Sequence, residues 1–212
     1  VQQAHLLVVK GRLLEAQGQD EDALDQFIAG AKLAGDLDLS PAMAAVEKLS
    51  QLAKKAADAH DDKKKEAYEA RANDLLSSYA ERASDDPQLA LTLGAAYLQA
   101  GNAAKAENLL QRAVEMRGND IDAHLQLGKA LSKLDRIPEA IAQLEAALKL
   151  DPMRVDIRLD IARTLETAGK TAEATAAYDK LLADPALPLT ARIYAGKFYA
   201  RQDTSLPTLA DT

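Results

Sequence analysis

The chain has 212 residues, of which 28% are charged and 48% hydrophobic, so its composition excludes both a disordered chain and an integral membrane protein. The net charge of −7 disfavours a general nucleic-acid binder, because phosphate binding needs clustered cations. The absence of cysteine excludes disulfides and thiolate metal sites. Strong helix formers dominate and no stretch alternates with period two, so we expect an all-α protein.

Two helical hairpins are expected at the N-terminal end. Residues 4–37 fit one pair of helices, through Gly11, Leu14, Gly18, Ala23 and Phe27. Residues 38–86 predict a hairpin with longer arms, one helix from Ser40 to about Ala59 and another from about Asp62 to Ala83. We expect Ser40 to cap the first of these helices and Pro41 to occupy its first turn. This hairpin is either a divergent repeat or a specialised projecting or pairing element.

A repeat of 34 residues organises the rest of the chain. A small residue recurs at Gly94, Gly128, Ala162 and Gly196, and a large one three positions later at Tyr97, Leu131, Leu165 and Tyr199. Alanine recurs twelve positions after the small residue, at Ala106, Ala140 and Ala174. Each unit therefore reads as two helices separated by a glycine-containing or polar turn, with small residues that let the helices approach closely. Because such a unit buries only one side, neighbouring units must stack.

These columns, together with Asp151-Pro152 at the close of a unit, resemble the tetratricopeptide repeat (TPR), in the style of bacterial scaffold proteins. The resemblance implies a right-handed superhelical solenoid of antiparallel helix pairs that forms a single domain over residues 1–212. The expected divisions are a repeat at 4–37, the overlong divergent hairpin at 38–86, repeats at 87–120, 121–154 and 155–188, a capping or half repeat at 189–202, and a tail at 203–212. The unfinished last repeat leads us to expect that the chain is cut inside a longer array.

No constellation of catalytic or metal-binding residues is recognisable. The three histidines, His5, His60 and His124, are scattered. The acidic run around His60 resembles a metal site, but we expect a solvated turn that caps a helix. We therefore expect no enzymatic activity, no cofactor and no bound metal.

The resemblance also implies a concave groove lined by the first helices of the repeats. It places there an apolar column, Leu91, Leu125, Leu159 and Ile193, and a basic column, Lys129, Arg163 and Lys197. Lys133 and Arg201 lie one turn further along, where cations also favour the helix dipole. Such a surface suits an acidic partner segment with apolar anchors, and a solvated charged face is the alternative.

We therefore expect a protein–protein interaction module, an adaptor or assembly scaffold that binds a peptide or a partner protein in this groove. The alternative is a structural segment of a larger multi-domain protein, either self-associating or a spacer. No stretch approaches the length of an apolar membrane span, so we expect a soluble protein, with the periplasm (cell envelope) and the cytoplasm both open as its compartment.

Overall fold

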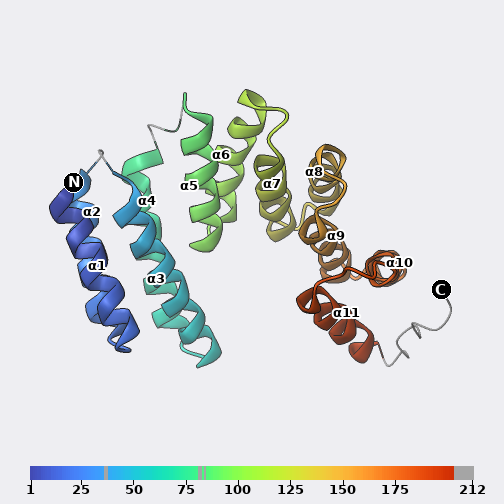
Figure 1. Cartoon of the computed structure of the whole chain (residues 1–212), viewed down its shortest axis with the longest axis horizontal. Helices are drawn as coiled ribbons and strands as arrows, with labels where there is room; N and C mark the ends of the chain where they lie inside the picture. Colours follow the sequence, from blue (N-terminus) through green and yellow to red (C-terminus); the bar gives the residue numbers. More distant parts are fainter. Residues whose placement is uncertain (36–37, 81–82, 84, 203–212) are drawn as a thin grey trace. The chain divides into compact units, whose positions relative to one another are not determined.

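The computed structural model describes residues 1–35, 38–80, 83 and 85–202, and its regular structure over these residues is entirely helical (Figure 1). The predicted all-α class is confirmed. The chain divides into two compact units, residues 1–113 and 114–212, and each is a stack of helical hairpins. A single domain over the whole chain stays a prediction, and the expected tail at 203–212 lies outside the described residues.

The first unit is built from three hairpins. Its helices are α1 Gln2–Ala16, α2 Asp20–Ala34, α3 Ser40–Asp58, α4 Asp62–Ala80, α5 Pro87–Gln99 and α6 Ala103–Met116, the last of which ends just beyond the unit. The first helices of successive hairpins contact one another, α1 with α3 and α3 with α5. The second helices α2 and α4 each contact the first helix of the next hairpin. The stacking expected of one-sided repeat units is therefore present.

The second unit repeats this arrangement. Its helices are α7 Ile121–Lys133, α8 Ile137–Leu150, α9 Val155–Thr167, α10 Thr171–Leu182 and α11 Leu189–Arg201. The first helices α7, α9 and α11 contact one another in turn, while α8 and α10 contact the first helix that follows each of them. Within the described part of the chain, α11 has no second helix of its own.

Every hairpin reverses direction through a three-residue turn whose middle residue has a left-handed backbone. The middle residues are Gly18, His60, Gly101, Asp135 and Gly169, with φ between 57° and 77°. The residue after each of them donates its amide to the carbonyl five residues back, as Asp61 does to Ala56 at 2.9 Å. This bond satisfies a carbonyl at the helix end that would otherwise lack a partner. The predicted glycine-containing or polar turns are confirmed, and His60 lies in one of them.

The hairpin α3/α4 is longer than its neighbours, as predicted. Each of its helices has 19 residues, whereas the other helices have 12 to 15. The predicted cap at Ser40 is wrong. Ser40 is already helical, and its amide donates to Oδ1 of Asp38 at 2.9 Å. The carboxylate of Asp38 therefore accepts a hydrogen bond at the start of α3 in place of the Ser40 hydroxyl. The hairpin packs against α1, α2 and α5, and a projecting or pairing role for it stays a prediction.

Close packing in the hairpins α5/α6 and α7/α8 depends on a glycine of the first helix. A Cβ added to Gly94 would lie 2.5 Å from Cγ of Leu110 on α6, and one added to Gly128 would lie 2.7 Å from Cγ of Leu144 on α8. Both leucines are fully buried. The two helices of a hairpin thus approach so closely that a large side chain of the second helix occupies the volume of the missing Cβ.

A buried lysine links three helices of the first unit. Only 3% of Lys48 on α3 is exposed, and its Nζ lies 2.5 Å from Oε1 of Glu15 and 3.0 Å from Oδ1 of Asp20. The bond from Lys48 lowers the pKa of Glu15, and bonds from Lys55 and Lys48 lower that of Asp20. Burial acts to lower the pKa of Lys48, but its two carboxylate partners raise it. One cation therefore ties α3 to the end of α1 and the start of α2.

The packing at Gly128 predicts opposite effects of the same substitution at two equivalent positions. Gly128→Ala should lower the free energy of unfolding of the second unit by about 1–2 kcal/mol, because overpacking against Leu144 exceeds the gain in helix propensity. Gly196→Ala, where no described atom lies within 4 Å of the added Cβ, should raise it by about 0.5–1 kcal/mol. Thermal and urea unfolding measure both changes. A stabilising Gly128→Ala would contradict the close approach.

The ion pairs of Lys48 predict a pH-dependent loss of stability. At pH 7, Lys48→Met should lower the free energy of unfolding by about 2 kcal/mol, because Glu15 and Asp20 lose their buried partner and keep only the more exposed Arg12 and Lys55. Their pKa values are lowered on folding, so the contribution is complete above about pH 5 and fades as the pH falls through the folded-state values. Urea unfolding from pH 7 to about pH 3 should show the difference from wild type shrinking. Lys54→Met, at an exposed lysine of the same helix, is the control, and a difference independent of pH would contradict the assignment.

Candidate functional site

Three first helices of the second unit present a common charged surface. We call it the first-helix face and define it by the residues Lys129, Lys133, Leu159, Asp160, Arg163, Glu166, Ile193, Tyr194, Lys197 and Arg201. Helical spacing places neighbouring members on adjacent turns of α7, α9 and α11, and the contacts between these helices bring the three sets together. This face contains all the predicted site residues except Leu91 and Leu125.

An acidic residue on α9 holds two of the predicted cations. The Oδ2 atom of Asp160 lies 3.1 Å from Nζ of Lys129 on α7, and its Oδ1 lies 3.9 Å from Nη1 of Arg163 on α9 itself. Asp160 is largely buried, whereas both cations are more exposed. The carboxylate therefore contacts the charged ends of two cationic side chains that remain partly exposed to solvent.

A second network joins α9 to α11. The guanidinium of Arg163 lies 4.8 Å from the ring centroid of Tyr194, a cation–π contact. Arg201 contacts Glu166 with 2.8 Å between Nη2 and Oε1, and the hydroxyl of Tyr178 donates to Oε2 of Glu166 at 2.7 Å. Burial, and then this hydrogen bond to Glu166, raise the pKa of Tyr178, so its hydroxyl stays a neutral donor. Arg163 and Arg201 are thus held in place from the buried side of the face.

The balance of charge on this face is positive. Two of its cations, Lys133 and Lys197, are exposed and form no ion pair with any described residue. The face carries five cations and two carboxylates, Asp160 and Glu166, which gives a local net charge of +3 in a chain of net charge −7. Cations are therefore concentrated on this face relative to the chain as a whole.

The predicted apolar column divides into buried and accessible members. Leu125 is 3% exposed and packs with Leu144 and Ile157 in the core, so its side chain is not available to a ligand. Leu159 is half-buried against the core of the second unit, and Ile193 is 47% exposed. Leu91 is half-buried on α5 in the first unit. The accessible apolar surface of the first-helix face is therefore concentrated at Ile193 and the adjacent Tyr194.

Three members of the face were not predicted from the sequence: Asp160, Glu166 and Tyr194. Asp160 and Glu166 lie three residues before and after Arg163, so helical spacing could have indicated them as neighbours of this cation. Tyr194 belongs to the next helix, and its contact with Arg163 depends on how α9 and α11 pack.

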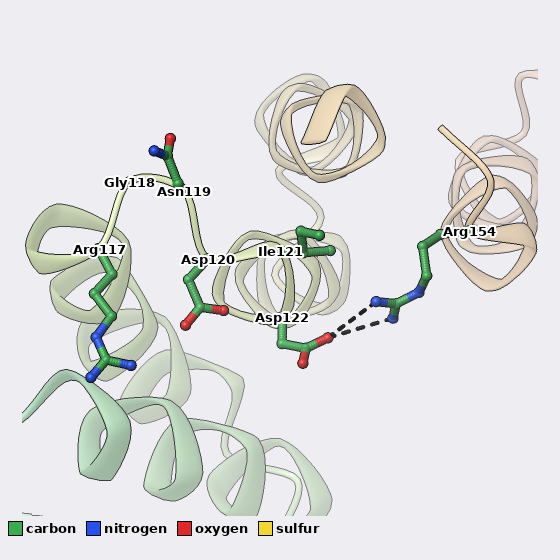
Figure 2. Close-up of a pocket in the computed structure, with 7 residues that line it drawn as sticks. All are labelled: Arg117, Gly118, Asn119, Asp120, Ile121, Asp122 and Arg154. Carbon is green, nitrogen blue, oxygen red and sulfur yellow. Dashed lines mark hydrogen bonds and ion pairs between the residues drawn. The ribbon is translucent and has the colours of Figure 1, made fainter. Parts of the chain in front are cut away.

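A hollow of about 590 Å³ lies at the start of α7 (Figure 2). Residues 117–122 and Arg154 line it, and Arg154 reaches Asp122 at 3.5 Å and Asp156 at 2.8 Å. Asp120 accepts a hydrogen bond from the amide of Ala123 and so caps α7. Figure 2 shows Arg154 pointing across the hollow to Asp122. The charges of Arg154 and Asp120 are therefore engaged in folding contacts.

A second hollow, of about 620 Å³, lies across the first helices of the first unit. It is lined by Val8, Arg12, Leu39, Ser40, Met43, Ala44, Glu47, Thr92 and Gln99. Here Arg12 pairs with Glu15 at 2.9 Å and with Glu47 at 2.7 Å, and these bonds raise its pKa. The first unit thus offers a hollow whose cation is neutralised by two carboxylates, in contrast to the first-helix face.

His124 takes part in packing and His60 lies in a turn, whereas His5 is exposed on α1 and lies 3.3 Å from Oδ2 of Asp38. His124 is buried, with Nδ1 2.7 Å from Oε1 of Gln143 and Nε2 3.0 Å from the carbonyl of Gly118. Over the residues described, no group of three or more histidine and acidic side chains is arranged to hold a metal ion. None of the described helices has both the length and the apolar character needed to cross a membrane.

Comparison with solved structures shows the same fold. A thermophilic TPR protein from Thermus thermophilus is similar with a TM-score of 0.61 and 20% identity, over 93% of this chain and 99% of that one. A double mutant of MamA RS-1 gives 0.56 and 16%, over 96% and 98%. YrrB, a TPR protein with an unusual peptide-binding site, gives 0.54 and 20%, over 90% of each chain. At these identities the likeness concerns the fold.

Family models identify the repeats directly. Two models described as tetratricopeptide repeat match residues 87–130 and 125–188. A search of curated proteins for similar sequences gave no match. Repeats of this kind are protein–protein interaction modules and are generally not enzymes. The predicted resemblance is confirmed over residues 87–188, where the chain contains tetratricopeptide repeats.

Proposed function

We propose that this chain is an adaptor or assembly scaffold whose first-helix face binds an acidic, partly apolar segment of a partner protein. The observation that carries the proposal is the local charge of +3 beside an exposed isoleucine and tyrosine, on a chain whose net charge is −7. Such a surface supplies both elements that a short segment needs, charge complementarity and an apolar anchor.

The cations are arranged to receive carboxylates along the length of a segment. Lys129, Arg163 and Lys197 come from three successive first helices, at steps of 34 residues. An extended acidic segment that crosses α7, α9 and α11 would meet them one after another. Charged groups of this kind mainly set the rate of approach and the choice of partner, because exposed pairs add little free energy each.

The apolar anchor lies on α11. Ile193 is 47% exposed and Tyr194 is 41% exposed, and burial of either side chain by a partner would contribute about 25 cal/mol per Å² of apolar surface. Because Arg163 already stacks on the ring of Tyr194, the aromatic surface is held in position before binding. Such preorganisation reduces the entropy lost on association.

The two carboxylates of the face compete with the carboxylates of a ligand for the cations. Asp160 lies beside Lys129 and Arg163, and Glu166 lies beside Arg201. They position these cations and also lower the positive potential that an acidic partner experiences. This arrangement favours reversible binding of moderate affinity. The peptide-binding site of YrrB, a protein of the same fold, supports a peptide as the class of ligand.

Removal of the three central cations should weaken binding of an acidic peptide. The probe is a short fluorescein-labelled peptide of glutamates with two leucines, measured by fluorescence anisotropy. The triple variant Lys129→Ala, Arg163→Ala and Lys197→Ala should bind it about tenfold or more weakly, equivalent to about 1.4 kcal/mol.

The matched control for this experiment removes three lysines outside the face, Lys149→Ala, Lys170→Ala and Lys180→Ala. It therefore has the same net charge as the first triple variant. A second control is a lysine-rich peptide with the same two leucines, which wild type should bind more weakly. Equal losses in the two triple variants, or no preference of wild type for the acidic peptide, would contradict the proposal.

Removal of the internal competitor should have the opposite effect. Asp160→Asn keeps the size of the side chain but frees Lys129 and Arg163 from their shared carboxylate. We expect affinity for the same peptide to rise by about two- to fivefold at low salt, and the gain to shrink as added salt screens the charges. Weaker binding of this variant would show that Asp160 is needed to position the cations.

A further inference from the structure

The three mid-helix cations of the first-helix face form a ladder with one cation on each first helix. Lys129, Arg163 and Lys197 occupy equivalent positions of α7, α9 and α11, at steps of 34 residues. Cα atoms of α7 and α9, and likewise of α9 and α11, approach within 8 Å of one another. Helices in such contact have axes about 8–10 Å apart. Equivalent positions on successive helices are therefore also about 8–10 Å apart.

Contacts between side chains show that the ladder is continuous. Asp160 lies 3.1 Å from Nζ of Lys129 and 3.9 Å from Nη1 of Arg163, so one carboxylate lies between the first two cations. The guanidinium of Arg163 lies 4.8 Å from the ring centroid of Tyr194, which precedes Lys197 by one turn on α11. The cations of the ladder thus alternate with a carboxylate and an aromatic ring.

The spacing of the ladder discriminates between the conformations that a partner segment can adopt. In a β-strand every second side chain lies on the same side, and two residues advance the chain by about 6.6–6.8 Å. In an α-helix the seventh residue returns to the same side after about 10.5 Å. In a polyproline II helix every third residue lies on the same side, and three residues advance the chain by about 9.3 Å. Only the last of these repeats falls within the separation of the cations.

The groups between the cations suit the same conformation. Asp160 repels an acidic side chain placed between the first two cations, so the residues between the carboxylates of a ligand should be uncharged. Tyr194 is 41% exposed, and Arg163 holds its ring in position. Segments in a polyproline II conformation dock on exposed aromatic side chains, and their prolines preform the conformation and reduce the entropy lost on binding.

We propose that the partner segment binds the first-helix face in a polyproline II conformation, with a carboxylate at every third residue and uncharged residues, proline among them, in between. This proposal rests on the function proposed above and narrows the class of partner. One turn of the ligand corresponds to one repeat of the protein, so successive carboxylates meet Lys129, Arg163 and Lys197. The partner is therefore a proline-rich acidic segment of the form Glu-x-x-Glu-x-x-Glu.

Three fluorescein-labelled peptides of equal length and equal charge test the spacing. Each contains three glutamates, separated by three, two or seven residues, in a background that favours the matching conformation: proline and alanine, threonine, or alanine and glutamine. In fluorescence anisotropy, wild type should bind the peptide with a spacing of three at least about fivefold more tightly than either of the others.

The possible outcomes separate this proposal from the proposed function. Tightest binding of the peptide with a spacing of two or seven would overturn the proposal and indicate a strand or a helix. Equal binding of all three, each tighter than a lysine-rich peptide, would also overturn it and would leave the proposed function intact. Failure of every acidic peptide to bind would overturn both.

A double-mutant cycle tests the register of the bound segment. The central glutamate faces Arg163 whichever way the peptide runs. Arg163→Ala and replacement of this glutamate by glutamine should each weaken binding by about threefold or more, and both changes together should weaken it little more than either alone. Lys170→Ala, outside the face, is the control and should show no such coupling. Circular dichroism establishes that both variants are folded. Losses at Arg163 and the central glutamate that simply multiply would overturn the proposed register.

Discussion

The architecture of this protein depends on the approach of two helices at a residue without a bulky side chain. At Gly94 and Gly128 the space of a missing Cβ is filled by Leu110 and Leu144, so the distance between the helices and the identity of the buried side chain are fixed together. Because each hairpin buries only one side in this way, its other side needs a neighbour, and stacking follows. Small residues therefore recur in the sequence at steps of 34 residues from Gly94 to Gly196, once in each first helix.

Much of the fold could be predicted because this requirement acts on single positions. The columns through Gly94 and Ala106 identified the helix pairs without any knowledge of their packing. What the sequence did not reveal were details decided by competition between neighbouring groups. Asp38, not Ser40, receives the first amide of α3, and two carboxylates are drawn to a buried lysine, Lys48, that sequence reasoning passed over. The contacts of Lys48 join helices far apart in the sequence, which the repeat pattern alone does not specify.

The candidate site shows the same division. The basic column could be predicted because Lys129, Arg163 and Lys197 are mid-helix and periodic, so capping of a helix dipole does not account for them. The apolar column was less informative, since the same periodicity places Leu125 in the core and Ile193 at the surface. The acidic residues between the cations, Asp160 above all, follow no period of 34 residues. They nevertheless lower the local positive charge and position the cations. The repeat pattern could not predict them, because they do not recur from one repeat to the next.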